Sequence, residues 1–244
     1  MVQDENVVQS ELSSFFLSCN KVVIARLPKL TIFSCHYTNT RYTQRLFKEF
    51  DIYFPNSLQR SVVKRQAEYF AGRYMAKLAL SALGIENTKV STGIDRAPSW
   101  PIAINGSISH THNTAYSAVG TTADFDYIGI DFEEFISPST SKDIASIIIN
   151  PHEQIRLASY NLKFEIMLTL IFSAKESLFK ALYQRVNEYF DFSAAEFVSI
   201  TGKDNQFVIQ LTRSLCSGLP KGKRFIGHFE IMNNHVLTVI AGSL

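Results

Sequence analysis

The sequence predicts an α+β protein built as a pseudo-dimer of two similar halves, each a small antiparallel sheet packed against one long helix. Three observations lead to this prediction. Helix-like and strand-like segments are grouped rather than alternating one by one, which is typical of α+β folds and not of doubly wound parallel sheets. Two long amphipathic helices are indicated, one in each half of the 244 residues. Apolar residues make up 46% and charged residues 19%, so a sizeable core is possible and global disorder is excluded.

In the first half, strands are expected at Val22–Arg26 and Leu30–Tyr37, because both segments are rich in β-branched and aromatic residues. Residues Ser61 to Leu83 carry apolar side chains at spacings of three to five, which predicts a helix, and Gly84 follows as a stop signal. A third strand is expected at Ala115–Val119.

The second half is expected to begin with a strand at Tyr127–Asp131 and to contain a long helix at Glu165–Val186, with its apolar residues on one face. Four further strands are expected to close the chain, near Phe197–Ile200, Phe207–Leu211, Arg224–Ile231 and Val236–Ala241.

The two halves are expected to join in a turn at Thr121–Asp126, which divides the chain into residues 1–122 and 123–244. The first half holds 13 basic and 8 acidic residues, and the second holds 11 and 14. The formal net charge of +2 therefore conceals a half at +5 and a half at −3. Near-neutrality overall argues against a non-specific nucleic-acid binder, whereas opposed charges suit a selective nucleotide site.

The three cysteines, Cys19, Cys35 and Cys216, are odd in number, scattered and without CxxC spacing. This pattern fits a reducing compartment and disfavours both a disulfide framework and a zinc site. The first residues lack a basic region followed by an apolar stretch, so no signal peptide is expected. Apolar stretches such as Ile166–Phe172 fall short of the ~18–20 residues that a membrane span needs. We therefore expect a cytoplasmic protein without a membrane span.

An acidic motif stands in the strand that opens the second half. Side chains alternate along a strand, so Asp131 and Glu133 are expected to share one face while Ile130 and Phe132 point to the other. Two carboxylates on one face repel each other unless a cation lies between them, and magnesium prefers such hard oxygen ligands. Taken alone, an ordinary solvated strand end is the favoured interpretation.

A second polar motif lies within the long helix of the second half. Ser173, Glu176 and Lys180 are spaced i, i+3 and i+7, so they are expected to form one stripe. Taken alone, Glu176 and Lys180 are interpreted as a simple i,i+4 ion pair worth about 0.3–0.5 kcal/mol. Together, the two motifs supply three carboxylates and a lysine, which is the set of groups needed to handle a metal-bound pyrophosphate.

Basic and polar residues gather in the first half. The predicted helix carries Arg65 and Arg73, which could anchor phosphate or simply form a solvated helix face. Arg96 follows in a Pro-containing loop, and Ser109 with His110 offers hydrogen-bond donors to an anion. A structural hydrogen-bonding role for His110 is the simpler alternative. No GxSxG elbow is present, so the Ser-His pair is not read as a hydrolase triad.

In this order, these elements resemble the 4′-phosphopantetheinyl transferases of the surfactin-synthetase-activating type, and among them the enterobactin synthase component D branch. The resemblance covers residues 65–180, about half of the chain. It is carried by Arg65…Gly72-Arg73, Arg96-x-Pro98-x-Trp100-Pro101, Gly106-Ser107-Ile108-Ser109-His110, Ile128-Gly129-Ile130-Asp131-Phe132-Glu133 and Phe172-Ser173-Ala174-Lys175-Glu176-Ser177-x-x-Lys180.

The resemblance implies a substrate, coenzyme A, bound in the cleft between the two halves. It implies transfer of the 4′-phosphopantetheine group to a serine of an apo carrier protein, with release of 3′,5′-ADP. Asp131, Glu133 and Glu176 would bind Mg²⁺, with Mn²⁺ as an alternative, and Glu176, Lys180 and Asp131 would be the catalytic residues. The nucleotide and its phosphates would be held by Arg65, Arg73, Arg96, Ser109, His110 and Lys180.

Several roles stay open at this point. Glu176 could be a base, a metal ligand or both. The expected partners are acyl, peptidyl or aryl carrier domains, first those of non-ribosomal peptide (siderophore) synthesis, docking near Ile136–Tyr160 on a monomeric enzyme. Two alternative functions are a metal-dependent nucleotide pyrophosphatase and a non-catalytic coenzyme A-binding protein.

Overall fold

A computed structural model describes residues 14–93, 95–201 and 205–244 of the chain. The chain divides into two compact units, Met1–Asp124 (unit 1) and Phe125–Leu244 (unit 2). Both units combine antiparallel sheets with helices, which confirms the predicted α+β class. The division lies two residues beyond the position expected from the sequence.

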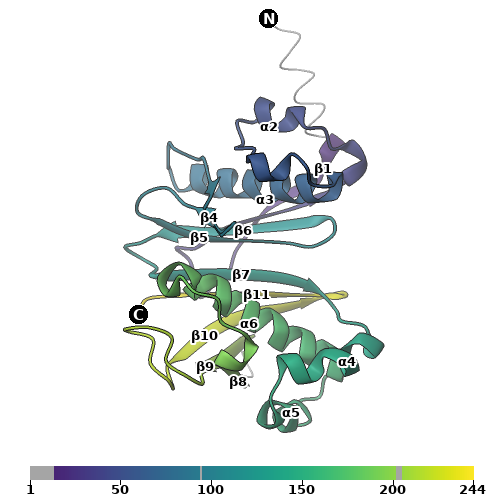
Figure 1. Cartoon of the computed structure of the whole chain (residues 1–244), viewed down its shortest axis with the longest axis vertical. Helices are drawn as coiled ribbons and strands as arrows, with labels where there is room; N and C mark the ends of the chain where they lie inside the picture. The colour runs from purple at the N-terminus through teal and green to yellow at the C-terminus, as the bar shows by residue number, and fades with distance from the viewer. Residues whose placement is uncertain (1–13, 94, 202–204) are drawn as a thin grey trace, which may run out of the picture. The chain divides into compact units, whose positions relative to one another are not determined.

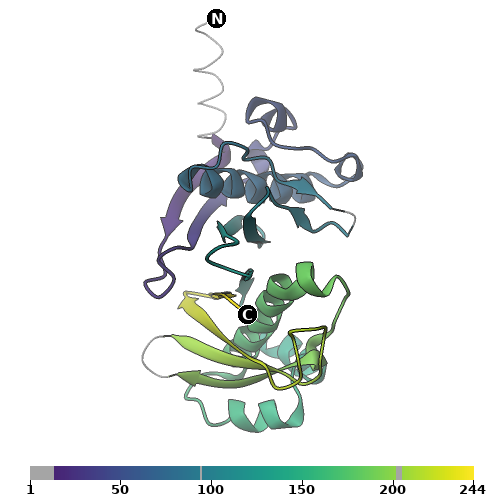
Figure 2. The same cartoon turned by 90° about the vertical axis from the view of Figure 1, so that its left-hand side faces the viewer.

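Unit 1 contains a four-stranded antiparallel sheet with one long helix, α3 (Val63–Ala82), lying along one face (Figures 1 and 2). The strand order is β1-β2-β6-β5. The strands are β1 (Phe16–Val22), β2 (Thr31–Tyr37), β5 (Ile104–His110) and β6 (Thr114–Thr121). Shorter elements complete the unit: η1 (Asn39–Arg41), α2 (Arg45–Glu49), η2 (Asn56–Leu58), β3 (Ser91–Thr92) and β4 (Pro98–Ser99).

The core of unit 1 explains why α3 forms where the periodicity predicts it. Phe70, Ala71 and Met75 are fully buried against the sheet, and Phe70 contacts a cluster of aromatic rings from β1 and α2. Gly84 has a φ of +76°, and its backbone N–H donates to Ser81 O. The left-handed conformation favours glycine, so the predicted stop signal ends the helix as expected.

Two strands of the four-stranded sheet in unit 1 differ from the sequence prediction. The strand predicted at Val22–Arg26 is wrong: β1 ends at Val22, and the following residues form the turn to β2, with Val23 74% exposed. β1 is an edge strand with several exposed polar residues, so its hydrophobic pattern is weak. β5 was not predicted because its sequence is polar and contains Gly106.

Unit 2 contains a five-stranded antiparallel sheet in the order β7-β11-β10-β9-β8, with α6 (Phe164–Val186) packed on one face. The strands are β7 (Tyr127–Glu134), β8 (Ala195–Thr201), β9 (Gln206–Leu211), β10 (Arg224–Met232) and β11 (His235–Gly242). Between β7 and β8 lie α4 (Pro138–Ile148), α5 (Pro151–Leu157), α6 and η3 (Phe192–Ala194). Each unit thus combines one larger sheet with one long helix, although the strand orders differ and unit 1 also has the two-stranded sheet β3-β4.

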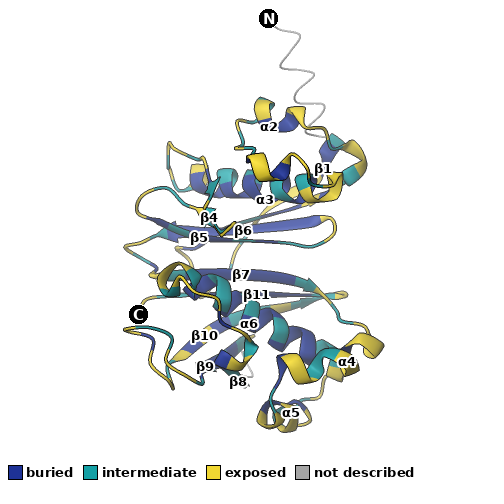
Figure 3. Cartoon of the chain, in the orientation of Figure 1, coloured by how far each residue is buried: buried dark blue, intermediate teal, exposed yellow. Residues whose placement is uncertain are grey.

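Figure 3 shows that the sheet-facing sides of α3 and α6 are buried, whereas α4 and α5 expose much of their surface. In unit 2 the core contains Leu170, Ala174 and Leu178 of α6 together with residues of β8, β9 and β11. No helix in the described part of the chain is both long and apolar enough to cross a membrane.

Candidate active site

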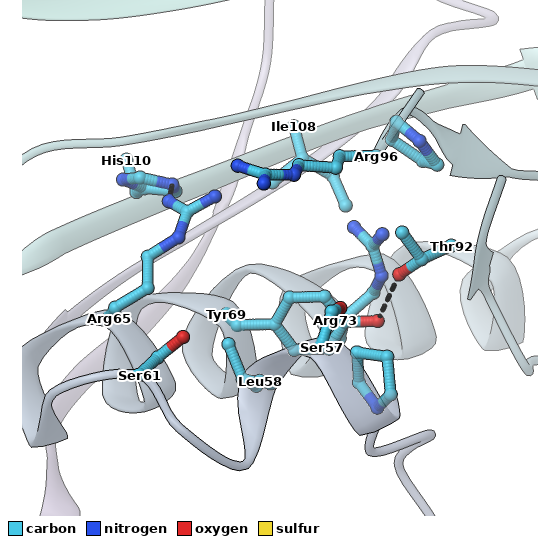
Figure 4. Close-up of a pocket in the computed structure, with 12 residues that line it drawn as sticks. Ser57, Leu58, Ser61, Arg65, Tyr69, Arg73, Thr92, Arg96, Ile108 and His110 are labelled. Carbon is cyan, nitrogen blue, oxygen red and sulfur yellow. Dashed lines mark hydrogen bonds between the residues drawn. The ribbon is translucent and has the colours of Figure 1, made fainter. Parts of the chain in front are cut away.

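Basic side chains of unit 1 line a pocket of about 230 Å³ beside α3. Figure 4 shows Arg65 and Arg73 reaching from α3, Arg96 from the loop before β4, and His110 from β5 toward the same space. Of the five anchors predicted in this half, the structure therefore brings four into one pocket. Further lining residues are Ser57 and Ser61 from the segment before α3, Tyr69 from α3 itself and Thr92 from β3.

Arg73 is the most buried cation of the pocket, with 6% of its surface exposed. Its guanidinium lies 4.6 Å from the centre of the Tyr69 ring, and Nη2 donates to Ser91 O at 3.3 Å. Within the described residues its buried Nε has no hydrogen-bond partner. Burial lowers the pKa of Arg73, since the charged form loses solvation. A buried guanidinium whose Nε–H has no hydrogen-bond partner is suited to bind an anion.

Arg65 and His110 form the second part of the pocket. Arg65 Nη1 lies 3.1 Å from His110 Nε2, and because a guanidinium can only donate, Nε2 accepts this bond. The Glu68 carboxylate lies near both groups, 3.7 Å from Arg65 Nη1 and 3.9 Å from His110 Nδ1. The sequence analysis did not identify Glu68 or Tyr69, since neither stands out among the residues of an amphipathic helix.

Close packing of α3 against β5 shapes one wall of the pocket. Gly72 has no side chain, and a Cβ there would lie 2.8 Å from the Ile108 side chain, which lines the pocket. Arg96 has a φ of +65° in a turn in which its N–H donates to Gly93 O. A non-glycine residue in the left-handed region is strained, and here the strained residue carries an anion-binding group.

Ser109 does not line this pocket. Along β5 the side chains alternate, so Ile108 and His110 share the face toward the pocket and the buried Ser109 lies on the other face. The adjacency of Ser109 and His110 in the sequence concealed this difference.

In unit 2, β7 and α6 meet at a glycine. A Cβ at Gly129 would lie 1.9 Å from Ser177 O, so only glycine permits this contact. Two residues further along β7, Asp131 is 1% exposed, and its Oδ1 accepts a hydrogen bond from Lys180 Nζ at 2.6 Å. Lys180 also donates to Ile130 O at 3.3 Å. The structure therefore brings together Asp131 of the first acidic motif and Lys180 of the second motif.

Glu133 and Glu176 belong to the same electrostatic cluster. The pKa of Glu133 is raised to about 8, first by burial and then by Asp131, while Lys180 opposes the shift. The pKa of Glu176 is raised by burial and by Asp131. We name Asp131, Glu133, Glu176 and Lys180 the acidic cluster. In the described part of the chain, no group of three or more His, Cys, Asp or Glu side chains is gathered closely enough to hold a metal ion.

The polar stripe on α6 contributes Glu176 and Lys180 to the acidic cluster, and its serine Ser173 connects the helix to β11. Ser173 is fully buried, and its hydroxyl is hydrogen-bonded to the Thr238 hydroxyl at 2.8 Å. Ser177 contacts the same hydroxyl at 2.7 Å, so this part of α6 is tied to β11. Ser173 therefore holds the helix on the sheet.

A small pocket of about 90 Å³ opens beside Glu176. Its walls are largely aromatic, with Phe179 on α6 and Tyr189, Phe190 and Phe192 in the segment that follows. The sequence analysis did not identify these residues, because aromatic side chains are more often part of the core.

The two sheet-and-helix units, one with a basic pocket and one with an acidic cluster, match models of a single protein family. Residues 54–120 match the 4′-phosphopantetheinyl transferase N-terminal domain, and residues 127–239 match the 4′-phosphopantetheinyl transferase superfamily. The chain belongs to the 4′-phosphopantetheinyl transferase superfamily, which confirms the resemblance carried by the motifs.

Among its relatives is enterobactin synthase component D of Escherichia coli (strain K12), which is 44% identical over 124 residues, 51% of this chain and 58% of that protein. The corresponding protein of Salmonella typhimurium is 38% identical, over 64% of this chain and 65% of that protein. The 4′-phosphopantetheinyl transferase PptT of Mycobacterium tuberculosis is 28% identical, over 75% and 82%. The matched region thus spans somewhat more than half of the enterobactin synthase component D chains.

Among solved structures, the chain is similar to Thermotoga maritima holo-(acyl-carrier-protein) synthase, with 18% identity over 49% of this chain and 64% of that chain and a TM-score of 0.38.

Proposed function

We propose that this protein transfers the 4′-phosphopantetheine group from coenzyme A to a serine of an apo carrier protein and releases 3′,5′-ADP. The observation that carries the proposal is the pocket formed by Arg65, Arg73, Arg96 and His110, which gathers four anion-binding groups inside the matched N-terminal domain. The names of its relatives support the same reaction.

The four basic groups of unit 1 would bind the nucleotide and its phosphates. Arg73 offers a buried guanidinium, and Arg65 and His110 offer a linked pair at the pocket wall. Arg96 adds a third guanidinium from an exposed turn. Charge-assisted hydrogen bonds from guanidinium to phosphate are strong and geometrically specific. The role expected of Ser109 in nucleotide binding receives no support from its position on the other face of β5.

The acidic cluster suits a divalent cation by the chemistry of its donors, although among the described residues its three carboxylates are not gathered closely enough to form a metal site. Asp131, Glu133 and Glu176 offer hard carboxylate oxygens, and burial, followed by repulsion from Asp131, raises the pKa of Glu133 and Glu176. We propose that these three residues hold Mg²⁺, with Mn²⁺ as an alternative. When bound, the cation neutralises charge on the pyrophosphate of coenzyme A.

The protein side chains then act on the reacting groups. The serine oxygen of the carrier attacks the β-phosphorus of coenzyme A, and the bond from that phosphorus to the bridging oxygen breaks. Glu176 accepts the serine proton as general base. Lys180 neutralises the charge that develops on the departing 3′,5′-ADP. Asp131 orients Lys180 through the hydrogen bond between them.

The deciding experiment incubates the full chain with coenzyme A, Mg²⁺ and an apo carrier domain, and weighs the carrier by mass spectrometry. The expected result is a carrier heavier by one phosphopantetheine group. Glu176→Gln is expected to reduce the rate by two to four orders of magnitude, as loss of a general base does. A carrier that gains no mass, tested with peptidyl, aryl and acyl carriers, would refute the proposal.

The same assay separates the two alternatives from the transferase. Release of 3′,5′-ADP at full rate without any carrier would indicate a nucleotide pyrophosphatase. Binding of coenzyme A with no turnover in any condition would indicate a non-catalytic binding protein. Removal of divalent cations by a chelator, followed by their return, tests the metal: transfer is expected to stop and to recover with Mg²⁺.

Carriers of siderophore synthesis are the first partners to test, because relatives at 38–44% identity are named enterobactin synthase component D. We propose that the carrier docks on the stretch Ile136–Tyr160, which contains α4 and α5. Ile147 and Ile155 there are 67% and 73% exposed, as a docking surface requires. The monomeric state and the cytoplasmic location remain predictions from the sequence.

A further inference from the structure

Two of the three cysteines face each other across a pair of strands. Cys19 in β1 is the register partner of Cys35 in β2, and all three cysteines carry free thiols in this structure. The proposed transferase reaction uses neither residue. The sequence alone suggested only scattered thiols, because residues 19 and 35 become neighbours through the turn between β1 and β2.

The hydrogen bonds of β2 define the kind of pair that these cysteines form. Tyr37 N–H donates to Asn113 O on the β6 side, and Thr38 N–H donates to Phe15 O on the β1 side. The direction of the backbone groups alternates along a strand, so those of Cys35, two residues before Tyr37, also point to β6. Cys19 and Cys35 are therefore a non-hydrogen-bonded pair.

This kind of pair brings side chains closest together in an antiparallel sheet. The Cα atoms of a non-hydrogen-bonded pair lie about 4.5 Å apart. A disulfide needs a Cα separation of roughly 4.4–6.8 Å, so the strands need not move apart or together to form one.

Both thiols lie on the face of the sheet that carries α3. Cys35 is buried in the same core cluster as Phe70 and Ala71. Burial is the largest cause of the raised pKa of Tyr74 on α3 and of Cys35; both cysteines add to the shift of Tyr74 and Cys19 adds to that of Cys35, as expected for groups that are close together. Cys19 is exposed at the sheet edge, whereas Cys35 is 1% exposed. A dissolved oxidant can therefore reach Cys19 first.

We propose that Cys19 and Cys35 form a reversible cross-strand disulfide, with a low-molecular-weight disulfide such as glutathione disulfide as the oxidant. The Cys19 thiolate attacks one sulfur of the oxidant, which forms a mixed disulfide and releases one glutathione thiolate. The Cys35 thiolate then attacks Cys19 Sγ and releases the second glutathione thiolate. The protein loses two protons and two electrons, and the oxidant is reduced to two thiols.

The disulfide would join the edge strand β1 to β2, under the helix that carries Arg65 and Arg73. It closes a short loop, so the oxidised protein is expected to unfold at a higher urea concentration than the reduced protein. Burial raises the pKa of both thiols, so the reaction is expected to become faster as the pH rises, because only the thiolate attacks.

The test treats the folded full chain with glutathione disulfide, alkylates remaining thiols after unfolding, and maps the peptides by mass spectrometry without reduction. We expect a linked peptide pair containing Cys19 and Cys35, full reversal by dithiothreitol, and Cys216 outside this link. Cys216→Ser is the matched control and is expected to form the same link, whereas Cys19→Ser is expected to leave Cys35 alkylated. A stable glutathione adduct on Cys19 with Cys35 still alkylated, or a mixture of pairings that includes Cys216, would overturn the proposal.

Discussion

Lys175 Nζ lies 2.9 Å from the Glu153 carboxylate, and both side chains are almost fully buried, at 3% and 0% exposure. Lys175 also donates to Ile148 O at 2.7 Å and to Phe192 O at 3.2 Å. Glu153 accepts hydrogen bonds from the backbone N–H groups of Asn150 and Phe197. With its hydrogen bonds, this ion pair connects the last residue of α4 and the first turn of α5 to the middle of α6. Lys175 directly precedes Glu176 in the sequence.

Glu153→Gln is expected to lower the free energy of unfolding by about 3–5 kcal/mol, since it leaves the Lys175 ammonium buried without a counter-charge. Burial already lowers the pKa of Lys175, and Glu153 opposes that shift. Urea denaturation measures the loss.

The double variant Glu153→Gln/Lys175→Met is expected to recover part of the loss, because it removes both charges. Glu196→Gln breaks the Arg156–Glu196 ion pair, which is more exposed, and is expected to cost no more than about 1 kcal/mol. Equal losses for Glu153→Gln and Glu196→Gln would show that burial does not set the energy of the first pair.

The contact between Gly129 and Ser177 O fixes β7 against α6. Gly129→Ala is expected to destabilise unit 2 by about 1–3 kcal/mol or more, because the new methyl group meets backbone rather than a movable side chain. Transfer activity is expected to fall further than stability alone explains, since β7 carries Asp131 and α6 carries Lys180.

Gly93→Ala is the matched control for stability alone, because its nearest neighbour would lie at an ordinary distance of 3.4 Å. Urea denaturation and the carrier mass assay report the two effects separately. Wild-type stability in Gly129→Ala would mean that the strand and the helix separate easily at this point.

Elements set by residues near in sequence could be predicted, whereas contacts between distant elements could not. The periodicity of α3 and α6 and the strand character of β7 were predictable, because each is set by residues near in sequence. The hydrogen bond between Asp131 and Lys180 was not predicted, because the sequence spacing indicated only an i,i+4 pair of Glu176 with Lys180. The partners of Lys175 could not be predicted, since they come from α4, α5 and η3 and are selected by burial. The face of Ser109 was missed because β5 itself was not predicted.

Tyr69 positions Arg73 in the basic pocket. Its ring lies under the guanidinium, and its hydroxyl is hydrogen-bonded to that of Thr92 at 2.7 Å. Tyr69→Leu removes both interactions and is expected to weaken coenzyme A binding about five- to tenfold, in line with a cation–π energy of about 1 kcal/mol. Tyr69→Phe keeps the ring and is expected to have the smaller effect.

Isothermal titration with coenzyme A measures both Tyr69 variants, and Tyr53→Leu serves as control because Tyr53 is 45% exposed and does not line the pocket. If Tyr69→Leu binds coenzyme A as tightly as the wild type does, Arg73 needs no support from this ring.

Ile155 on α5 offers the sharpest test of the proposed carrier surface. Its side chain is 73% exposed, so Ile155→Asp is expected to change the free energy of unfolding by no more than about 0.5 kcal/mol. The new carboxylate places a charge in an apolar contact, so the KM for the carrier is expected to rise about tenfold or more. Coenzyme A binding is expected to stay unchanged.

Ile226→Asp on β10, where the residue is 56% exposed, makes the same substitution outside the proposed surface. It is expected to leave the KM for the carrier and the affinity for coenzyme A unaltered. An equal rise in the carrier KM for both variants would indicate a general effect of charge, and no rise for Ile155→Asp would exclude this part of α5 from the docking surface.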